Sequence, residues 1–357
     1  MLLSLNPFKH INGLYGLDQC LKYQEEKCTK PHIYEIARNA YRNLQQNGKA
    51  QAILISGESG AGKTEATKHV IQFLVHASHS ANSAGHIANK VLQSSHILEA
   101  FGNACTMSNK NSSRFGKFVQ LQLSQQGEIT GAIIEVFLLE KSRIAWQAPG
   151  ERSYHIFYQL LRGGSFATLA ELSLTRNAKD FAFLCHSGCE SIPGVDGAAL
   201  FRKLLSAFDS IGIDAQERHS IFKVLAAILH LGNVRFKPRE SETPKGGIVE
   251  VENTDVIDTV SRLLEVSREI LEESLLVREF RGADRSSVYS IPFEQIQAEE
   301  ARDALAVALY SCLFDWLVSR INSHLQGHPT VPNNANKRIC VFDIFGFENL
   351  DKNSLEQ

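Results

Sequence analysis

The sequence predicts an α/β fold in which helices flank a mixed, mainly parallel central sheet, with a mainly helical region in the second half of the chain. The sheet is predicted by short apolar runs at residues 51–56 and 337–345, the pattern of buried strands. The helices are predicted by apolar residues that recur at helical spacing through most of residues 148–232.

The composition is that of an ordinary globular protein. The 357 residues are 43% hydrophobic and 21% charged with a net charge of −2, so no nucleic-acid partner is expected. No apolar run approaches the roughly 20 residues that span a bilayer, and residues 1–7 lack the basic segment of a signal peptide. We therefore expect no membrane span and a cytoplasmic location.

Seven cysteines are scattered along the chain, and the close pair is Cys185 and Cys189, which flank His186. Zinc binding is one interpretation of this pair, but no second Cys or His pair lies at ligand spacing. We favour reduced cytosolic thiols.

The first strand, at 51–56, ends at a glycine, and apolar spacing predicts a helix over 63–76. Small polar residues at 78–85 indicate a surface loop. A second helix is expected over 86–100.

A β-hairpin is expected next, because alternating strands at 118–123 and 129–138 flank the turn residues 125–128. Beyond the helical middle of the chain, a polar stretch separates it from further helices and from the late strand. These later segments are 221–231 (helix), 237–247 (polar), 256–264 and 299–325 (helices) and 337–345 (strand).

The loop between the first strand and its helix carries the strongest chemical signal. It matches G-x-x-x-x-G-K-[ST] in full, so its glycines let backbone N–H groups cradle phosphates at a helix N-terminus. Lys63 would neutralise phosphate charge and Thr64 would bind Mg²⁺. A chance glycine-rich turn is the alternative, but the strand and helix favour a P-loop NTPase core. The residues concerned are Gly57, Glu58, Ser59, Gly60, Ala61, Gly62, Lys63, Thr64 and Glu65.

Two weaker signals follow. Residues 109–117 place two hydroxyls and an arginine before a strand, although Asn and Ser clusters are usually turns. Asp343 ends the late strand, the position of a Mg²⁺-water ligand, and the following Gly346 allows close backbone approach to a γ-phosphate. For Asp343 and Glu348 a solvated strand end is the alternative.

Taken together, GESGAGKTE, NKNSSRFGK and DIFGFE resemble the P-loop, switch I and switch II of the myosin motor domain, whereas kinesins differ in both switches. The resemblance is colinear over nearly the whole chain. The other segments that resemble the family are Asn6-Pro7-Phe8-Lys9 with Tyr15, and residues 31–34, 98–104, 138–143 (LLEKSR), 150–161, 228–233 and 302–305.

The resemblance implies binding and hydrolysis of MgATP. Asn6, Pro7, Lys9 and Tyr15 would line the adenine pocket. Asn109, Ser112 and Ser113 would act from switch I, with Ser113 and Thr64 on Mg²⁺ and Asp343 acting through water. The residues given catalytic roles by the resemblance are Ser112, Arg114, Gly346 and Glu348, with Arg114 and Glu348 forming the salt bridge that closes the switches.

The resemblance also implies an ATP-dependent motor on filamentous actin. Residues 1–147 would form the nucleotide core, 148–336 a mainly helical upper actin-binding subdomain, and 337–357 the switch II strand and the start of the relay region. The chain resembles a motor domain truncated at both ends, so light chains or calmodulin would bind only through a neck outside this sequence. Ser287 occupies the position of a regulatory acidic or phosphorylatable residue; an ordinary loop serine is the alternative.

Three departures from the family pattern flank switch I: Cys105, Ser108 and Lys110. They leave the named ligands intact and keep open a second function, a nucleotide-regulated actin tether or scaffold with little ATP turnover. A third class, a non-motor P-loop enzyme such as a kinase or GTPase, fits the paired switches poorly.

Overall fold

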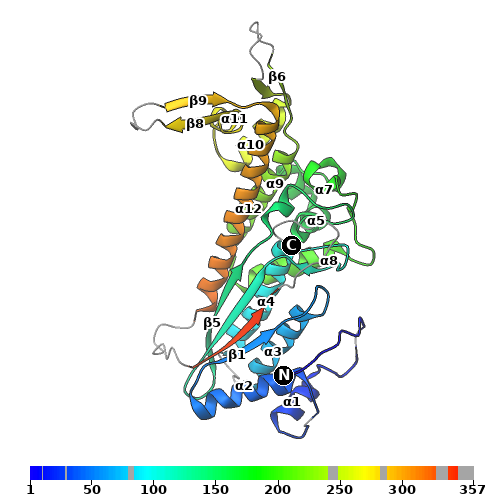
Figure 1. The fold of residues 1–357 in the computed structure, drawn as a ribbon, viewed down its shortest axis with the longest axis vertical. Helices are drawn as coiled ribbons and strands as arrows, with labels where there is room; N and C mark the ends of the chain where they lie inside the picture. The colour runs from blue at the N-terminus through cyan, green and yellow to red at the C-terminus, as the bar shows by residue number, and fades with distance from the viewer. Residues whose placement is uncertain are drawn as a thin grey trace. The chain divides into compact units, whose positions relative to one another are not determined.

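A computed structural model describes residues 1–9, 11–28, 30–78, 84–239, 248–281, 288–326 and 337–344 (Figure 1). The chain forms two compact units that interleave along the sequence. The first gathers residues 1–140, 203–213 and 316–357, and the second gathers residues 141–202 and 214–315.

The first unit contains the four-stranded sheet and the helices of the N-terminal part of the chain. Its elements are α1 (Leu17–Gln24), α2 (Ile33–Asn47), β1 (Gln51–Ile55), α3 (Lys63–Ala77), α4 (Ala84–Gly102), β2 (Asn103–Ala104), β3 (Ser112–Ser113), β4 (Gly116–Leu123), β5 (Ile129–Phe137) and β10 (Arg338–Asp343).

The sheet is mixed, in the order β1-β10-β4-β5. β1 pairs with β10 in parallel, so the strand before the glycine-rich loop and the late strand lie side by side. β10 pairs antiparallel with β4, and β4 with β5. Within the described residues the expectation of a mainly parallel sheet is therefore wrong, because the predicted hairpin forms and contributes antiparallel pairings.

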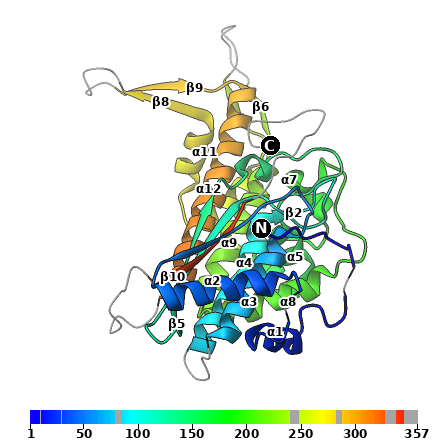
Figure 2. The ribbon, with the colours of Figure 1, turned by 60° about the horizontal axis from the view of Figure 1, so that its bottom comes forward.

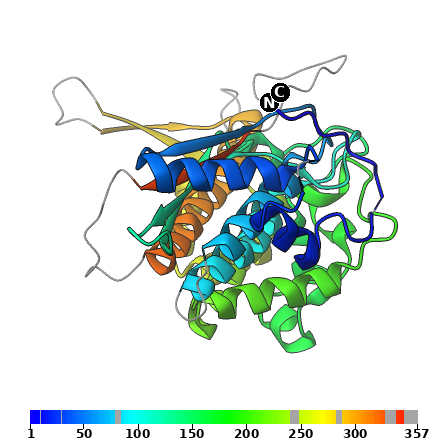
Figure 3. The same cartoon turned by 90° about the horizontal axis from the view of Figure 1, so that it is seen from below.

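Helices α2, α3 and α4 pack beside one another, as Figure 2 shows. α2 contacts β1 and β10, and Figure 3 shows it running alongside these strands. Its N-cap is His32, whose ring accepts a hydrogen bond from the Tyr34 N–H, and its C-cap is Gly48, with φ +66°. The expected helices 63–76 and 86–100 are confirmed. The expected loop at 78–85 falls mostly on residues outside the described ranges.

The second unit is mainly helical, as the sequence predicts. Its elements are the 3₁₀ turns Lys141–Ile144 and Ala178–Asp180, α5 (His155–Gly163), α6 (Phe166–Glu171), α7 (Ala182–Cys185), α9 (Ala215–Gly232), β6 (Phe236–Pro238), β7 (Val249–Val251), α10 (Thr254–Leu264), α11 (Arg268–Leu276), β8 (Val277–Arg281) and β9 (Val288–Pro292). The hairpins β6–β7 and β8–β9, with strands of 3 and 5 residues, were not predicted.

Helix α9 forms the centre of this unit. A capping box fixes its start, since the Asp214 side chain accepts the Glu217 N–H and the Glu217 side chain accepts the Asp214 N–H. Its last two turns are buried on every side, from Leu225 to Gly232. A helix that is apolar all round belongs in a core, and this one does.

Two helices belong in part to each unit, α8 (Gly197–Ser210) and α12 (Gln295–Leu325). By length and composition alone, α12 is long and apolar enough to cross a membrane. Most of its buried residues instead recur every three or four positions, the spacing of a core helix. These are Ala306, Tyr310, Phe314, Leu317, Ile321 and Leu325, and Ala298 and Leu313 are buried as well.

Candidate functional site

The glycine-rich loop adopts a conformation that depends on its glycines. Gly60 has φ +80° and Gly62 has φ +92°, a region that residues with a Cβ rarely adopt. Gly62 is the N-cap of α3, so the loop delivers backbone N–H groups to the positive end of a 15-residue helix dipole. Local sequence therefore builds a concave, electropositive turn suited to an anion.

The ammonium group of Lys63 folds back over the start of this loop. Its Nζ donates hydrogen bonds to the carbonyl oxygens of Gly57, at 2.7 Å, and Glu58, at 2.8 Å. These contacts hold the positive charge at the mouth of the loop.

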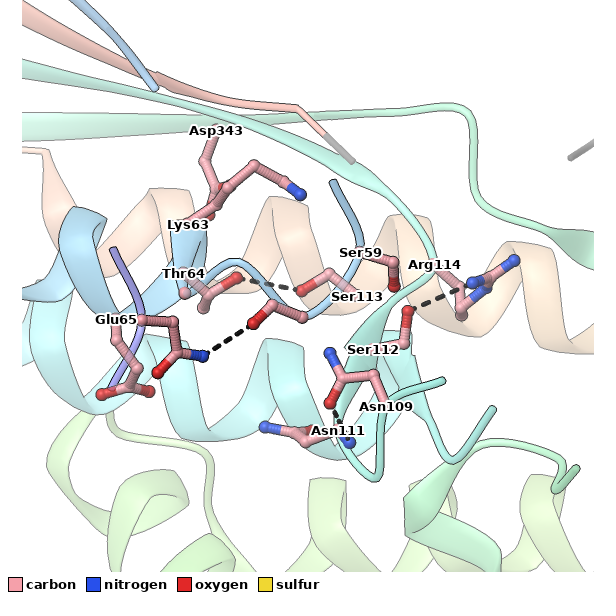
Figure 4. A pocket seen from close by; sticks show the side chains of 13 residues that line it. Ser59, Lys63, Thr64, Glu65, Asn109, Asn111, Ser112, Ser113, Arg114 and Asp343 are labelled. Carbon is pink, nitrogen blue, oxygen red and sulfur yellow. Dashed lines mark hydrogen bonds between the residues drawn. The ribbon is translucent and has the colours of Figure 1, made fainter. Parts of the chain in front are cut away.

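Residues far apart in sequence meet beside the loop around a cavity of about 200 Å³. In Figure 4 the Thr64 and Ser113 hydroxyls point toward one another, and their oxygens are 3.2 Å apart. Asp343, at the end of β10, lines the same cavity. The lining residues are Asn6, Ser59, Gly60, Gly62, Lys63, Thr64, Glu65, Asn109, Asn111, Ser112, Ser113, Arg114 and Asp343.

A short antiparallel pairing places the serines. β2 and β3 align Asn103 with Ser113 and Ala104 with Ser112. Because side chains alternate along a strand, neighbouring serines point in opposite directions. Ser113 turns to Thr64, while Ser112, only 4% exposed, accepts a hydrogen bond from Arg114 Nη1 at 3.1 Å.

Arg114 is 3% exposed, and its guanidinium also donates from Nε to Glu140 Oε2 at 2.5 Å. Glu140 was not among the sequence-predicted site residues, although it lies within the quoted LLEKSR segment. The expected hairpin could have predicted the pairing of Arg114 with Glu140, because these residues lie just outside its two ends. β4 and β5 align Gly116 with Phe137, which brings the residues just before and just after the hairpin together.

The asparagines of the segment 109–111 stabilise its turn. The Asn111 N–H donates to Asn109 Oδ1 at 3.0 Å, and Asn103 Nδ2 donates to Asn111 Oδ1, also at 3.0 Å. Asn109 faces Gly60 across the cavity, and a Cβ on that glycine would lie 3.9 Å from Asn109 Nδ2.

A second cavity, of about 670 Å³, adjoins the first. All four sequence-predicted adenine residues line it: Asn6, Pro7, Lys9 and Tyr15. Both cavities share Asn6, Gly62 and Glu65. Asn6 Nδ2 donates to the Gly60 carbonyl at 2.7 Å, which ties the N-terminal segment to the loop.

Some expectations lie outside the described residues. Gly346, Glu348 and Ser287 are among them, so the Arg114–Glu348 pair and the regulatory serine stay predictions. Of the three departures, Cys105 is buried, Ser108 lies 3.3 Å from the Thr106 hydroxyl, and Lys110 is exposed. None of the three is among the residues lining either cavity.

The donor set fits a hard cation. Two hydroxyl oxygens and one carboxylate at the 200 Å³ cavity are the ligand types that Mg²⁺ takes from proteins. Within the described ranges no three His, Cys, Asp or Glu residues are placed to hold a metal ion among themselves. Cys185 and Cys189 are not joined in a disulfide, and each thiol donates a hydrogen bond to a backbone carbonyl.

These features define an α/β protein in which a G-x-x-x-x-G-K-T loop joins a strand of a mixed sheet to a helix, beside a Ser-Ser-Arg segment and a strand-end Asp. Residues 1–357 match the family "Myosin head (motor domain)". The chain belongs to the myosin head family.

Similar proteins support the same assignment. The chain is 40% identical over 368 residues to the Myosin IE heavy chain of Dictyostelium discoideum, covering 100% of this chain and 36% of that protein. It is 42% identical over 357 residues to Myosin-1 of Arabidopsis thaliana, covering 100% of this chain and 29% of that protein. The chain thus spans about a third of the length of these curated relatives.

Proposed function

We propose that this chain is the nucleotide-binding part of an ATP-driven, actin-based motor. The observation that carries the proposal is the 3.2 Å approach of the Thr64 and Ser113 hydroxyls beside Asp343, because three distant segments converge there on one oxygen-rich site. A P-loop ATPase needs that convergence of loop, switch I and switch II strand.

In this proposal the loop and Lys63 bind the triphosphate. The Lys63 ammonium, now on the Gly57 and Glu58 carbonyls, turns to the β- and γ-phosphates, while the N-terminus of α3 supplies further positive potential. Asn109 contributes from the opposite wall of the cavity.

Thr64, Ser113 and, through water, Asp343 would hold Mg²⁺. The ion supplies neutralisation of phosphate charge. Replacing Ser113 by Cys tests this role. A thiolate-type ligand disfavours Mg²⁺ and accepts softer cations, so we expect ATPase activity to fall at least about tenfold with Mg²⁺ and to recover in part with Mn²⁺ or Cd²⁺. Equal activity with Mg²⁺ in both proteins would remove Ser113 from the site.

Ser112 and Arg114 would act on the γ-phosphate. Because Arg114 donates to Ser112 Oγ, the serine is free to direct its own O–H at a phosphate oxygen. The register of β10 on β4 pairs Asp343 with Lys117, so switch II begins next to the end of switch I. We propose that Gly346 and Glu348 meet Ser112 and Arg114 there. Glu348→Ala is expected to block hydrolysis while ATP still binds.

Asn6, Pro7, Lys9 and Tyr15 would receive the adenine in the larger cavity. Residues 148–336 would form the mainly helical upper actin-binding subdomain, with Ser287 as its regulatory position. Light chains or calmodulin would bind through a neck beyond these residues. The protein would act on the actin cytoskeleton in the cytoplasm.

The deciding experiment is the steady-state ATPase of the protein extended to the length of its relatives, with and without filamentous actin. Strong activation by actin supports the motor. Tight ATP binding without activation supports the tether, with Cys105, Ser108 and Lys110 as the residues to revert. Preference for GTP over ATP would overturn both.

A further inference from the structure

The Tyr15 ring, which lines the proposed base pocket, is already covered by another ring. His69, on α3, stacks on it with centroids 3.7 Å apart and planes 10° from parallel. Both rings line the 670 Å³ cavity together with Asn6 and Lys9. A planar base cannot insert between rings at this spacing, which is already van der Waals contact.

The other rings beside Tyr15 are fixed in place. His32 lies 5.3 Å away; its Nδ1 accepts the Tyr34 N–H, so its Nε2–H donates to the Leu14 carbonyl. Tyr34 is fully buried, 6.0 Å from Tyr15 and edge-on, and its hydroxyl donates to the Tyr15 carbonyl at 2.8 Å. Moving either ring would break hydrogen bonds inside the core.

His69 is held less well. Its Nδ1 is buried with no hydrogen-bond partner among the described residues. A buried nitrogen without a partner is unfavourable, and the ring regains a hydrogen bond if it turns into water. Burial lowers the pKa of His69, against the smaller opposing effects of a side-chain hydrogen bond with Gln72 and of the Glu65 charge, so the neutral ring is favoured. The contact between the His69 and Tyr15 rings is therefore the stacking of two neutral rings.

We propose that His69 is a displaceable plug of the base pocket: a purine takes its place on the Tyr15 face, and the imidazole turns outward. This inference rests on the proposed nucleotide site and assigns a new role within it. The plug lowers affinity for the base and leaves the phosphate site unaffected, because binding of the base must first separate the stacked His69 and Tyr15 rings.

Histidine labelling tests the plug directly, because it predicts an effect opposite to ordinary ligand protection. The wild-type protein is treated with diethyl pyrocarbonate, and carbethoxylation of His69 is measured by peptide mass spectrometry. ATP should raise the labelling rate of His69 several-fold. Inorganic tripolyphosphate, which carries three phosphates and no base, should leave it unchanged. Protection of His69 by ATP would overturn the plug.

Binding variants give an independent test. His69→Ala is expected to bind ATP roughly 2- to 10-fold more tightly and tripolyphosphate with unchanged affinity. His69→Phe keeps a stacking ring without the unpaired nitrogen, so it should bind ATP no better than wild type. Weaker ATP binding by His69→Ala would make His69 a base contact and overturn the plug. An equal change in the affinities of His69→Ala for ATP and for tripolyphosphate would also overturn the plug. If wild-type protein binds neither ligand, the proposed nucleotide site fails, and the plug fails with it.

Discussion

At the scale of single residues, the charge of Arg114 is the most tightly enclosed in the site. Arg114 is 3% exposed and Glu140 is 7% exposed. The two residues are joined by the salt bridge between their side chains and by a 3.0 Å hydrogen bond from the Glu140 N–H to the Arg114 carbonyl. An enclosed guanidinium depends on its carboxylate because water cannot replace it.

Removing that carboxylate should therefore cost much more than the loss of a surface ion pair. We expect Glu140→Ala to lower the free energy of unfolding by about 3–5 kcal/mol and to slow ATP hydrolysis. Glu140→Gln keeps an acceptor for Nε and should cost less, about 1–3 kcal/mol. Urea denaturation of the three proteins measures both values. The exposed pair Lys223–Glu265 gives a control, since water screens its charges and Glu265→Ala should cost far less than Glu140→Ala. Equal costs at both sites would contradict this assignment.

At the scale of elements, the end of α4 is in direct contact with the second half of segment 109–117, the switch I segment. A Cβ at Gly102 would lie 2.3 Å from the Phe115 ring, and the Gly102 carbonyl accepts the Arg114 N–H at 2.9 Å. The close approach leaves no space for a side chain.

Gly102→Ala should therefore displace switch I. We expect a loss of about 1–3 kcal/mol in stability from overpacking, together with weaker nucleotide binding. Gly116→Ala is the matched control on the other side of Phe115, because its Cβ would be 3.7 Å from the nearest atom, an ordinary contact. Calorimetry and nucleotide titration check both variants. Similar losses in the two would show that the Phe115 contact is not the cause.

A second element depends on one distant side chain. Asn322, on α12, accepts the Ile134 N–H at 2.8 Å and donates to the Ile134 carbonyl at 2.7 Å. Ile134 lies on β5, at the end of the described sheet, and is 2% exposed. The amide therefore replaces a neighbouring strand at that point.

Asn322→Leu would leave a buried N–H and a buried C=O without partners. We expect a cost of about 2–4 kcal/mol, against under about 1 kcal/mol for Asn322→Gln if its longer amide reaches the same two groups. Hydrogen exchange at the Ile134 amide should accelerate strongly in Asn322→Leu. Unchanged protection there would mean that Asn322 does not hold β5.

The predictable parts of this site are the local ones. The loop, its strand and its helix follow from residues within about one βα unit, and spacing alone predicts them. Glu140 lies 26 residues from Arg114, and Asn322 lies 188 residues from Ile134. Such partners depend on register and packing. The hairpin itself was predicted, but its antiparallel pairing with β10 was not, because the alternation within a hairpin does not specify which strand lies beside it.

At the scale of the whole molecule, the histidines whose pKa is perturbed share one direction. Burial lowers the pKa of His32, His69, His96 and His230, and lowers that of His155 to about 3. They belong to both units. A folded state that resists protonating several histidines must lose stability in acid, because the unfolded chain takes up the protons.

His230 allows the sign and size of this effect to be measured. It is 8% exposed, and its Nε2 lies 3.0 Å from the Leu172 carbonyl. Its lowered pKa means that the stabilising contribution is complete above the unfolded pKa of about 6.5 and is lost as the pH falls below it, by at most about 1.4 kcal/mol per pH unit. His230→Gln removes the titratable imidazole and retains an N–H donor for the Leu172 carbonyl. Urea denaturation at pH 7.5 and 5.5 should show a smaller acid loss in His230→Gln than in wild type. An identical loss in both proteins would place the acid sensitivity at the other buried histidines.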